Sequence, residues 1–412
     1  MAKKKDEMNC SFCGRAKSDV DVLIAGVTGH ICENCIEQAH QIIGEQIVHK
    51  KSESSGQNYE LLKPIEIKEK LDEYIIGQDD AKKILSVAVY NHYKRISAKS
   101  KTEDVEIEKS NVILVGRTGT GKTLLVKTIA KMLDVPFCVA DATVFTQAGY
   151  VGEDVESILS RLLAAADFDV EAAERGIVFI DEIDKISRKS ANPSITRDVT
   201  SEGTQQALLK LLEGSEVKVP PEGGRKHPDQ KMITVNTSNI LFIGGGAFDG
   251  IERIIGRRMN TSALGFSNES DNSKIDPEEL LQYIIPTDIK EFGLIPELIG
   301  RMPVISHLDP LDAKALRRIL TEPKNSLIKQ YNHLFDLDGV KLTFESDVLD
   351  FIVEKAIQFK LGARGLRSIC EAILTDAMFD IPSKKDIKEY KVTLDYAKSK
   401  FGNSRMAKLK IA

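Results

Sequence analysis

The stretch Gly116-Arg117-Thr118-Gly119-Thr120-Gly121-Lys122-Thr123 decides the fold of this chain. It matches the pattern GxxxxGK followed by Ser or Thr at every required position. Before it, the apolar run Val112–Val115 predicts a strand buried on both faces, and after it Leu124–Leu133 predicts a helix. A chance glycine-rich turn is the alternative, but it would rarely have both neighbours. The sequence therefore predicts a P-loop in an α/β domain with a mostly parallel sheet.

This loop predicts an ATP site. Its backbone N–H groups can surround phosphate oxygens, and the positive end of the following helix attracts the same negative charge. Lys122 adds a charge for the β and γ phosphates, and Thr123 offers its hydroxyl to Mg²⁺. We expect ATP to contact residues 116–123 and the helical residue Leu124.

A second apolar run, Ile177–Ile180, ends in the acidic pair Asp181 and Glu182. Such pairs are common in loops, but downstream of a P-loop a carboxylate is needed beside the metal. We expect Asp181 to hold the Mg²⁺ shell and Glu182 to orient or deprotonate the attacking water. A third run, Ile240–Ile243, predicts another buried strand, so the domain is predicted to hydrolyse ATP as well as bind it.

Four of the six cysteines form two pairs, Cys10-x2-Cys13 and Cys32-x2-Cys35, separated by residues 14–31. This spacing is typical of a tetrahedral zinc site, and four thiolates leave no open position, so the zinc is predicted to be structural. A redox pair or two disulfides are the alternatives. His30 could replace one thiolate, but a histidine at this position is more often a neighbour of such a site than a ligand.

The charge balance argues against nucleic acid as a partner. The chain has a net charge of -5, and residues 1–50 contain six Lys or Arg and seven Asp or Glu, a net -1. Zinc bound by four thiolates adds about -2 more. A basic face is what phosphate backbones require, so we expect this module to bind protein instead, by self-association or by docking partners.

The sequence divides into blocks with different patterns. Residues 1–50 form the predicted zinc module and residues 51–63 a polar linker; residues 64–308 carry the ATPase pattern, and residues 309–412 predict a small helical domain with a short strand or two. The N-terminus has no apolar signal segment, and no run approaches 18 apolar residues. We therefore expect a cytoplasmic protein with reduced thiols and no membrane contact.

Taken in order, these blocks resemble the ClpX family of AAA+ unfoldases, the regulatory ATPases of ClpXP proteases. The resemblance covers essentially the whole chain. It implies a homohexameric ring that unfolds tagged proteins and delivers them to the ClpP peptidase, with adaptor proteins as further partners. We can assemble no protease triad from the sequence, so cleavage is assigned to the partner.

The resemblance also implies roles around the nucleotide. In Tyr74-Ile75-Ile76-Gly77-Gln78, the side chains of Ile75 and Ile76 would line adenine. Arg301 matches an arginine finger that reaches a neighbouring subunit's γ-phosphate, and Arg364 matches the sensor 2 arginine of the small domain. By residue pattern alone, each would be an ordinary surface arginine.

Further motifs imply contacts with other proteins. Tyr150 and Val151, in Gly149-Tyr150-Val151-Gly152, are similar to a pore loop that grips substrate, where the alternative is a tight turn. Other segments resemble a second pore loop, an entrance loop for substrate tags and a loop that binds ClpP; their residues are Arg197, Arg225-Lys226-His227 and Leu264-Gly265-Phe266, respectively. A solvated turn for the basic trio and a buried local contact for the last tripeptide are the competing interpretations.

The chain departs from the family pattern at some positions, and three other functions compete with this interpretation. Leu264 stands where Ile is commoner, which the family tolerates. Arg117 stands where the family usually has Pro, and no sensor 1 residue can be assigned after Ile240–Ile243. The rivals are a nucleic-acid motor with a zinc ribbon, the related peptidase regulator HslU, and a remodelling chaperone that acts without a peptidase. The acidic cysteine module counts against the nucleic-acid motor, and the absence of a long inserted domain counts against HslU. The tripeptide at 264–266 counts against a chaperone without a peptidase.

Overall fold

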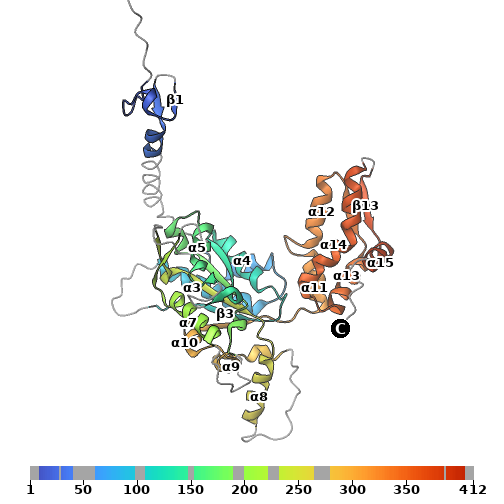
Figure 1. Ribbon diagram of the computed structural model, residues 1–412. Coiled ribbons are helices and arrows are strands. Elements are labelled where there is room, and N and C mark those ends of the chain that lie inside the picture. Colours follow the sequence, from blue (N-terminus) through green and yellow to red (C-terminus); the bar gives the residue numbers. More distant parts are fainter. Residues whose placement is uncertain are drawn as a thin grey trace, which may run out of the picture. The chain divides into compact units, whose positions relative to one another are not determined.

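The computed structural model describes most of the chain. The described residues are 9–26, 29–39, 61–97, 107–146, 153–188, 199–220, 232–263, 279–384 and 387–403. The chain divides into two compact units, Met1–Leu61 and Leu62–Ala412 (Figure 1). This division falls inside the predicted linker 51–63. Within the described ranges, no helix combines the length and apolar character that a membrane crossing requires.

The first unit is a small cysteine module. A 3-10 helix η1 (Lys17–Asp19) precedes an antiparallel hairpin of β1 (Leu23–Ala25) and β2 (His30–Cys32), and residues 33–39 are helical. Of the apolar residues that the structure describes in this unit, Cys10 and Cys32 alone are buried. The described part of the module therefore has no apolar core of its own.

The second unit contains a five-stranded parallel sheet in the order β11-β3-β10-β7-β4. Its strands are β3 (Val112–Val115), β4 (Phe137–Asp141), β7 (Ile177–Asp181), β10 (Leu241–Gly246) and β11 (Val304–His307). The central strands are continuous apolar runs because helices cover both faces of the sheet. The predicted α/β class with a mostly parallel sheet is confirmed.

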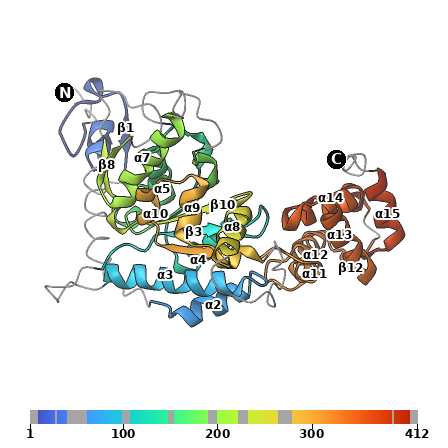
Figure 2. The ribbon, with the colours of Figure 1, turned by 90° about the horizontal axis from the view of Figure 1, so that it is seen from below.

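Successive residues of each strand point to opposite faces of the sheet and belong to two different hydrophobic cores. Val112 and Leu114 face α2, α3 and α4, whereas Ile113 and Val115 face the core built by α5, α7 and α10 (Figure 2). The bounds of these helices are α2 (Pro64–Asp72), α3 (Asp79–Ser97), α4 (Lys122–Leu133), α5 (Ser157–Ala165), α7 (Val199–Glu213) and α10 (Pro296–Gly300).

Shorter elements connect these layers. They are η2 (Ala142–Val144), β5 (Phe145–Thr146), β6 (Glu153–Asp154), α6 (Val170–Ala173), η3 (Ile183–Ile186), β8 (Glu216–Val219), β9 (Ile233–Asn236), η4 (Thr237–Asn239), α8 (Ile251–Ala263), η5 (Leu280–Tyr283) and α9 (Pro286–Phe292). Four of the gaps between described residues fall among them, and these gaps contain the predicted pore, entrance and ClpP-binding segments.

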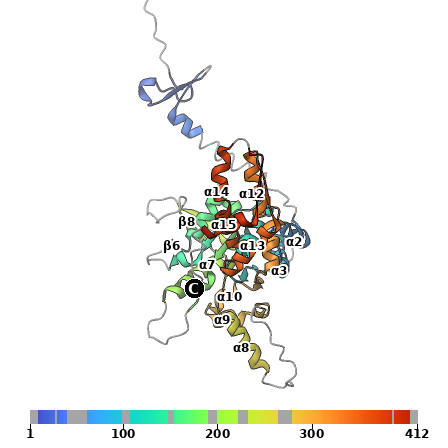
Figure 3. The ribbon, with the colours of Figure 1, turned by 90° about the vertical axis from the view of Figure 1, so that its right-hand side faces the viewer.

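The C-terminal part is a small helical domain, as the sequence predicts (Figure 3). Its elements are α11 (Ala313–Thr321), α12 (Leu327–Leu337), β12 (Lys341–Phe344), α13 (Ser346–Gln358), α14 (Gly362–Asp380), η6 (Ile381–Ser383), β13 (Glu389–Val392) and α15 (Leu394–Asn403). The strands β12 and β13 pair in parallel. A hydrophobic core separate from those of the sheet holds these helices together.

Candidate nucleotide and metal sites

The P-loop connects the end of β3 to the start of α4. Gly119 and Gly121 have φ angles of +86° and +106°, which side chains other than glycine rarely tolerate. The backbone N–H of Gly116 donates to the carbonyl of Gly246 at 3.1 Å, so the loop begins beside the end of β10. Left-handed residues of this kind allow successive backbone N–H groups to point toward one anion, as in an anion-binding nest.

Lys122 begins α4 and lies inside this loop. Its side chain is largely buried, and its Nζ donates to the carbonyls of Gly116 at 2.5 Å and Arg117 at 3.1 Å. Burial lowers the pKa of Lys122, and the negative charge of Asp181 opposes that effect. The ammonium is therefore held at the centre of the loop, where phosphate oxygens would meet it.

The acidic pair lies at the same edge of the sheet. Thr123 Oγ1 donates to Asp181 Oδ2 at 3.2 Å, because the carboxyl ends of parallel strands meet at one edge. Glu182 follows with a left-handed φ of +56°, and its N–H donates to Asp181 Oδ1 at 3.0 Å. This conformation is uncommon for a residue with a side chain and is enriched at functional sites. The structure thus brings Lys122, Thr123, Asp181 and Glu182 together.

Asp184 is a charged residue of this region that sequence reasoning missed. It is buried, its Oδ1 accepts from the N–H of Ala247 at 3.2 Å, and its Oδ2 pairs with Lys185 at 3.2 Å. A Cβ on Gly246 would lie 2.7 Å from Asp184 Oδ1. Phe248 Cε2 would be as close, at 2.6 Å, so both neighbours leave no room for a side chain at the last position of β10. The sequence signal that could have found Asp184 is a third acid, two residues after Glu182.

Arg364 lies in the first turn of α14, and that turn approaches the P-loop. A Cβ on Gly119 would lie 3.6 Å from the backbone nitrogen of Ala363. The charge of Arg364 contributes to the lowered pKa of Lys122. The structure therefore brings the predicted sensor 2 residue close to the predicted phosphate site.

Ile75 and Ile76 are buried in the segment between α2 and α3. The segment is anchored on two sides: Lys82 Nζ donates to the carbonyl of Ile75 at 2.6 Å, and the amide of Gln78 bonds both backbone groups of Asp309 at 2.8 Å each. Asp309 begins the connection to the small domain. Sequence reasoning did not find this contact because its partners are 231 residues apart.

Arg301 lies near the amino ends of the strands, opposite to the carboxyl ends where the P-loop and the acidic pair lie. It caps the end of α10, and its carbonyl accepts from Asn111 Nδ2 at 2.8 Å. Asn111 immediately precedes β3, whereas the P-loop follows β3. The guanidinium is half-exposed and pairs with Glu213 at 3.4 Å. The structure does not bring Arg301 to the P-loop of its own chain.

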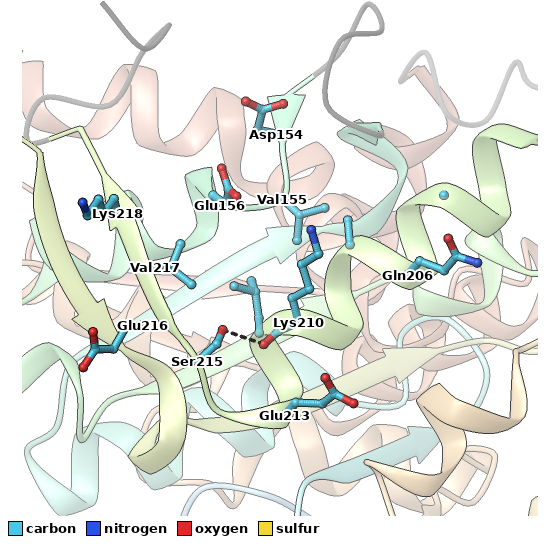
Figure 4. A pocket seen from close by; sticks show the side chains of 13 residues that line it. Asp154, Val155, Glu156, Gln206, Lys210, Glu213, Ser215, Glu216, Val217 and Lys218 are labelled. Atoms are coloured by element: carbon cyan, nitrogen blue, oxygen red, sulfur yellow. Dashed lines mark hydrogen bonds between the residues drawn. The ribbon is translucent and has the colours of Figure 1, made fainter. Parts of the chain in front are cut away.

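The predicted substrate and peptidase contacts lie outside the described residues. They are Tyr150, Val151, Arg197, Arg225, Lys226, His227, Leu264, Gly265 and Phe266. Their described flanks include a pocket of about 600 Å³ between β6, α7 and β8. Lys210 rises into this pocket, with Asp154 and Glu156 at its upper rim and Glu213 below (Figure 4). The pocket is charged and separate from the P-loop.

The four paired cysteines converge in the first unit. The Sγ atoms of Cys10 and Cys35 lie 3.9 Å apart and those of Cys13 and Cys32 3.6 Å apart, and all four lie within 4.8 Å of one another. Tetrahedral zinc with bonds of about 2.3 Å requires sulfur atoms about 3.8 Å apart. Without metal the thiols differ: the backbone N–H of Cys13 contributes most to lowering the pKa of Cys10 to about 6, whereas burial raises the pKa of Cys35 to about 12. The donor set therefore fits structural zinc.

The other residues of interest do not join this cluster. His30 lies in β2 and is not one of the four clustered donors that the described residues provide. Cys138 and Cys370 are buried in two different hydrophobic cores of the second unit.

A P-loop and an acidic pair at the carboxyl edge of a parallel sheet, with a helical domain touching the loop, define an AAA+ ATPase. Comparison with family models agrees: residues 107–305 match the AAA domain of the Cdc48 subfamily and residues 311–394 match the C-terminal D2-small domain of ClpB protein. Residues 8–45 match the ClpX C4-type zinc finger.

Relatives that match nearly the whole chain show to which family of AAA+ ATPases it belongs. The ATP-dependent Clp protease ATP-binding subunit ClpX of Bacteroides thetaiotaomicron is 61% identical over 415 residues, covering 100% of both chains. The protein of that name from Porphyromonas gingivalis is 63% identical over 387 residues, covering 93% of this chain and 94% of its own. The chain therefore belongs to the ClpX family. It is an ATP-binding AAA+ ATPase with a four-cysteine zinc module.

Proposed function

We propose that this chain is an ATP-dependent protein unfoldase and translocase that works as a homohexamer and delivers tagged substrates to the ClpP peptidase. The observation that carries the proposal is the contact between Thr123 and Asp181 beside Lys122. It joins the two motifs that a hydrolytic P-loop site needs. The relatives' name, Clp protease ATP-binding subunit, supports the peptidase partner.

In the proposed site, the P-loop backbone from Gly116 to Leu124 binds the phosphates. Thr123 and Asp181 would hold Mg²⁺, which supplies positive charge to the phosphate oxygens. Glu182 orients or deprotonates the attacking water. Ile75 and Ile76 line the base, and Arg364 contacts the phosphates from the small domain.

Arg301 completes the site of a neighbouring subunit. Arg301 lies near the amino ends of the strands, whereas the P-loop of its own chain lies at their carboxyl ends. This position supports a role in a neighbouring subunit, because Arg301 does not reach the nucleotide site of its own chain. A finger supplied in trans stabilises negative charge in the transition state and makes hydrolysis depend on assembly. That dependence requires a neighbouring subunit, and the number six is proposed from the resemblance to the family.

The substrate path is assigned to the segments outside the described ranges. Tyr150 and Val151 grip the polypeptide, Arg197 contacts it further along, and residues 225–227 attract the carboxylate end of a tag. Residues 264–266 insert into a hydrophobic cleft on the peptidase.

The domain assignment and surroundings belong to the same proposal. We assign residues 1–50 to the zinc module, 51–63 to the linker, 64–308 to the large ATPase domain and 309–412 to the small domain, in a cytoplasmic protein. Phe12, Val22 and Ile24 are exposed on the zinc module. They offer apolar area for adaptors, for substrates or for a second copy of the module.

A tagged, stable fluorescent protein tests the proposal. With ATP and Mg²⁺, fluorescence should fall without peptidase, and addition of the peptidase should produce fragments. The Glu182→Gln variant should keep nucleotide affinity within about threefold and lose at least about a hundredfold in ATP turnover, because the water is no longer activated. Glu171→Gln, an exposed acid on α6, is the matched control and should match the wild type.

Two results would contradict the proposal. Normal turnover by Glu182→Gln removes that residue from hydrolysis. Fluorescence that falls at the wild-type rate in Tyr150→Ala removes the pore loop from unfolding.

A further inference from the structure

Helix α7 contacts both ends of the short helix that carries Arg301. In the middle of α7, Gln205 is fully buried, and its Oε1 accepts from the backbone N–H of Ile295, the N-cap of α10, at 2.8 Å. At the last position of α7, Glu213 pairs with Arg301, the C-cap of α10, at 3.4 Å. Thus α7 sets the start of α10 through an amide and its end through an ion pair.

The same amide reaches the hydrolytic side of the sheet. Gln205 Nε2 donates to the carbonyl of Ile186 at 2.7 Å and lies 3.4 Å from the carbonyl of Gly293. Ile186 is the last residue of η3, the single turn that directly follows Asp181 and Glu182. One side chain therefore joins the segment after the acidic pair to the segment before Arg301.

The backbone segments on either side of the Gln205 amide are in close contact with each other. The N–H of Arg188 donates to the carbonyl of Gly293 at 3.0 Å. Gly293 has a φ of +124°, and a Cβ there would lie 2.5 Å from the carbonyl oxygen of Arg188. The two segments that Gln205 joins are thus in backbone contact, and a displacement of one must move the other.

A buried polar side chain is costly unless its hydrogen bonds are satisfied. An apolar side chain of similar length would fill the same space, but it would leave the carbonyl of Ile186 and the N–H of Ile295 without their partner. The next residue, Gln206, is exposed and lines the pocket of Figure 4. The two neighbouring glutamines therefore differ in burial and in what they can transmit.

We propose that Gln205 is a positioning residue for the arginine finger, and that it transmits the arrangement of η3 in one subunit to the Arg301 that this subunit presents to its neighbour. The proposal rests on the proposed role of Arg301 in trans. When ATP binding or hydrolysis shifts Asp181 and Glu182, η3 moves with them. The amide then carries that shift to the start of α10.

The first test replaces the amide by a side chain of similar length. Gln205→Met removes all three contacts, and we expect ATP turnover of the assembled protein to fall about tenfold, less than in Arg301→Ala, because the finger is misplaced but present. Nucleotide affinity should stay within about twofold, since no P-loop contact is lost. The matched control, Gln206→Met, should keep wild-type turnover.

A second variant guards against simple misfolding. Gln205→Glu keeps an acceptor for Ile295 but turns a carboxylate toward the carbonyl of Ile186. If the thermal transition of Gln205→Met is lost, this variant provides the turnover measurement instead. We expect a fall in turnover together with a retained cooperative transition. Wild-type turnover in a folded Gln205→Glu or Gln205→Met protein would overturn the proposal.

Mixed rings separate a role in positioning the finger from damage to the variant's own site. A Glu182→Gln subunit cannot hydrolyse ATP but has an intact finger, whereas a Gln205→Met subunit has intact carboxylates and a misplaced finger. After subunit exchange at equal amounts, about a quarter of the sites should combine intact carboxylates with an intact neighbouring finger. Turnover should therefore rise above the mean of the two separate variants.

Two further mixtures of variant subunits serve as controls for this experiment. Gln205→Met with Arg301→Ala should show no rise, because neither subunit supplies a well-placed finger. Arg301→Ala with Glu182→Gln should rise, and its failure would contradict the finger in trans itself. If that mixture rises while Gln205→Met with Glu182→Gln does not, Gln205 serves only the fold of its own site and the inference is wrong.

Discussion

The cysteine module and the ATPase unit are held together by different forces. In the module, Cys10 and Cys32 are the buried apolar residues of the described part, while Phe12 and Ile24 are exposed. In the ATPase unit, whole strands such as Val112–Val115 are buried on both faces by helices. A domain without an apolar core needs another source of folding free energy, and bound metal supplies it. The large unit depends on burial of apolar area instead.

The cysteines show this difference within one residue type. Cys10, Cys13, Cys32 and Cys35 bring their sulfur atoms together, whereas Cys138 packs among the apolar side chains of a hydrophobic core. A thiol thus acts as a ligand in one unit and as a small apolar group in the other. Each unit can therefore be perturbed by a treatment that leaves the other intact.

Removal of zinc should have the largest effect and should be confined to the module. With a zinc-selective chelator in excess Mg²⁺, we expect residues 9–39 to unfold completely, since structural zinc supplies on the order of 10 kcal/mol to such modules. ATP turnover should change by less than about twofold, because the residues of the proposed nucleotide site all belong to the other compact unit, Leu62–Ala412. Heteronuclear NMR and a coupled ATPase assay on the same sample measure both.

A matched variant controls for side effects of the chelator. Cys13→Ser removes one thiolate at nearly constant volume and should reproduce the loss of the module's fold. If chelation or Cys13→Ser lowered the melting transition of the ATPase unit, the separation of the two units would be wrong.

Thiol reactivity should separate the same two groups of cysteines. Burial raises the pKa of Cys138 and of Cys370 to about 12 each. At pH 8 their thiolates are then about a thousandfold scarcer than those of ordinary cysteines, and only the thiolate reacts. With a chromogenic disulfide reagent and chelator, four thiols should react quickly and two only after denaturation. Six thiols reacting in one fast phase would contradict this assignment.

The sequence predicts those parts of the structure whose signals are local. The P-loop, the acidic pair and the cysteine pairs are each short patterns with a known geometry, and buried parallel strands appear as continuous apolar runs. The three central strands that the sequence indicates all lie in the sheet, adjacent to one another. Their order was not predicted, because it depends on contacts between distant residues.

Residues that act through distant partners gave no such signal. Gln205 bonds Ile295, 90 positions away, and Gln78 bonds Asp309, 231 positions away. A single buried glutamine has the same appearance in a sequence as an exposed one such as Gln206. Only the fold decides which of two adjacent glutamines carries a contact.

The core of the ATPase unit should be sensitive to a single added methyl group. A Cβ on Gly245, in β10, would lie 2.4 Å from Phe179 Cζ, so Gly245→Ala should lower the free energy of unfolding by about 3 kcal/mol through overpacking. This should lower the midpoint of thermal unfolding by several degrees, about 2 to 4 °C per kcal/mol for a domain of this size. Scanning calorimetry measures it, and the zinc content should stay at one per chain.

The chain offers a glycine that should respond in the opposite way. Gly256 lies inside α8, where the nearest atom that a Cβ would meet among the described residues is Leu280 Cδ1, at the ordinary distance of 3.7 Å. Gly256→Ala should therefore be neutral or should stabilise the protein by up to about 1 kcal/mol. Equal destabilisation by the two alanines would show that packing against Phe179 is not the cause.

An effect smaller than that of Gly245→Ala concerns a buried lysine in the same unit. Lys109 Nζ donates to the carbonyl of Thr237 at 2.8 Å and lies 4.9 Å from the centre of the Phe242 ring. Burial lowers the pKa of Lys109 to about 7, and the nearby charge of Arg95 adds to this. The unfolded chain keeps an ordinary lysine pKa, so between about pH 7 and pH 10 it binds more protons than the folded chain. The free energy of unfolding should therefore rise with pH over this window.

Replacing this lysine should flatten that rise. In Lys109→Met the group no longer titrates, so the gain in unfolding free energy from pH 7 to pH 9 should be about 2 kcal/mol smaller than in the wild type. Denaturant unfolding at the two pH values measures the difference. Lys127→Met, on α4, is the control and should keep the wild-type slope. Parallel slopes for the wild type and Lys109→Met would mean that Lys109 is charged in the folded state, and the pH dependence would then have to come from another group of the ATPase unit.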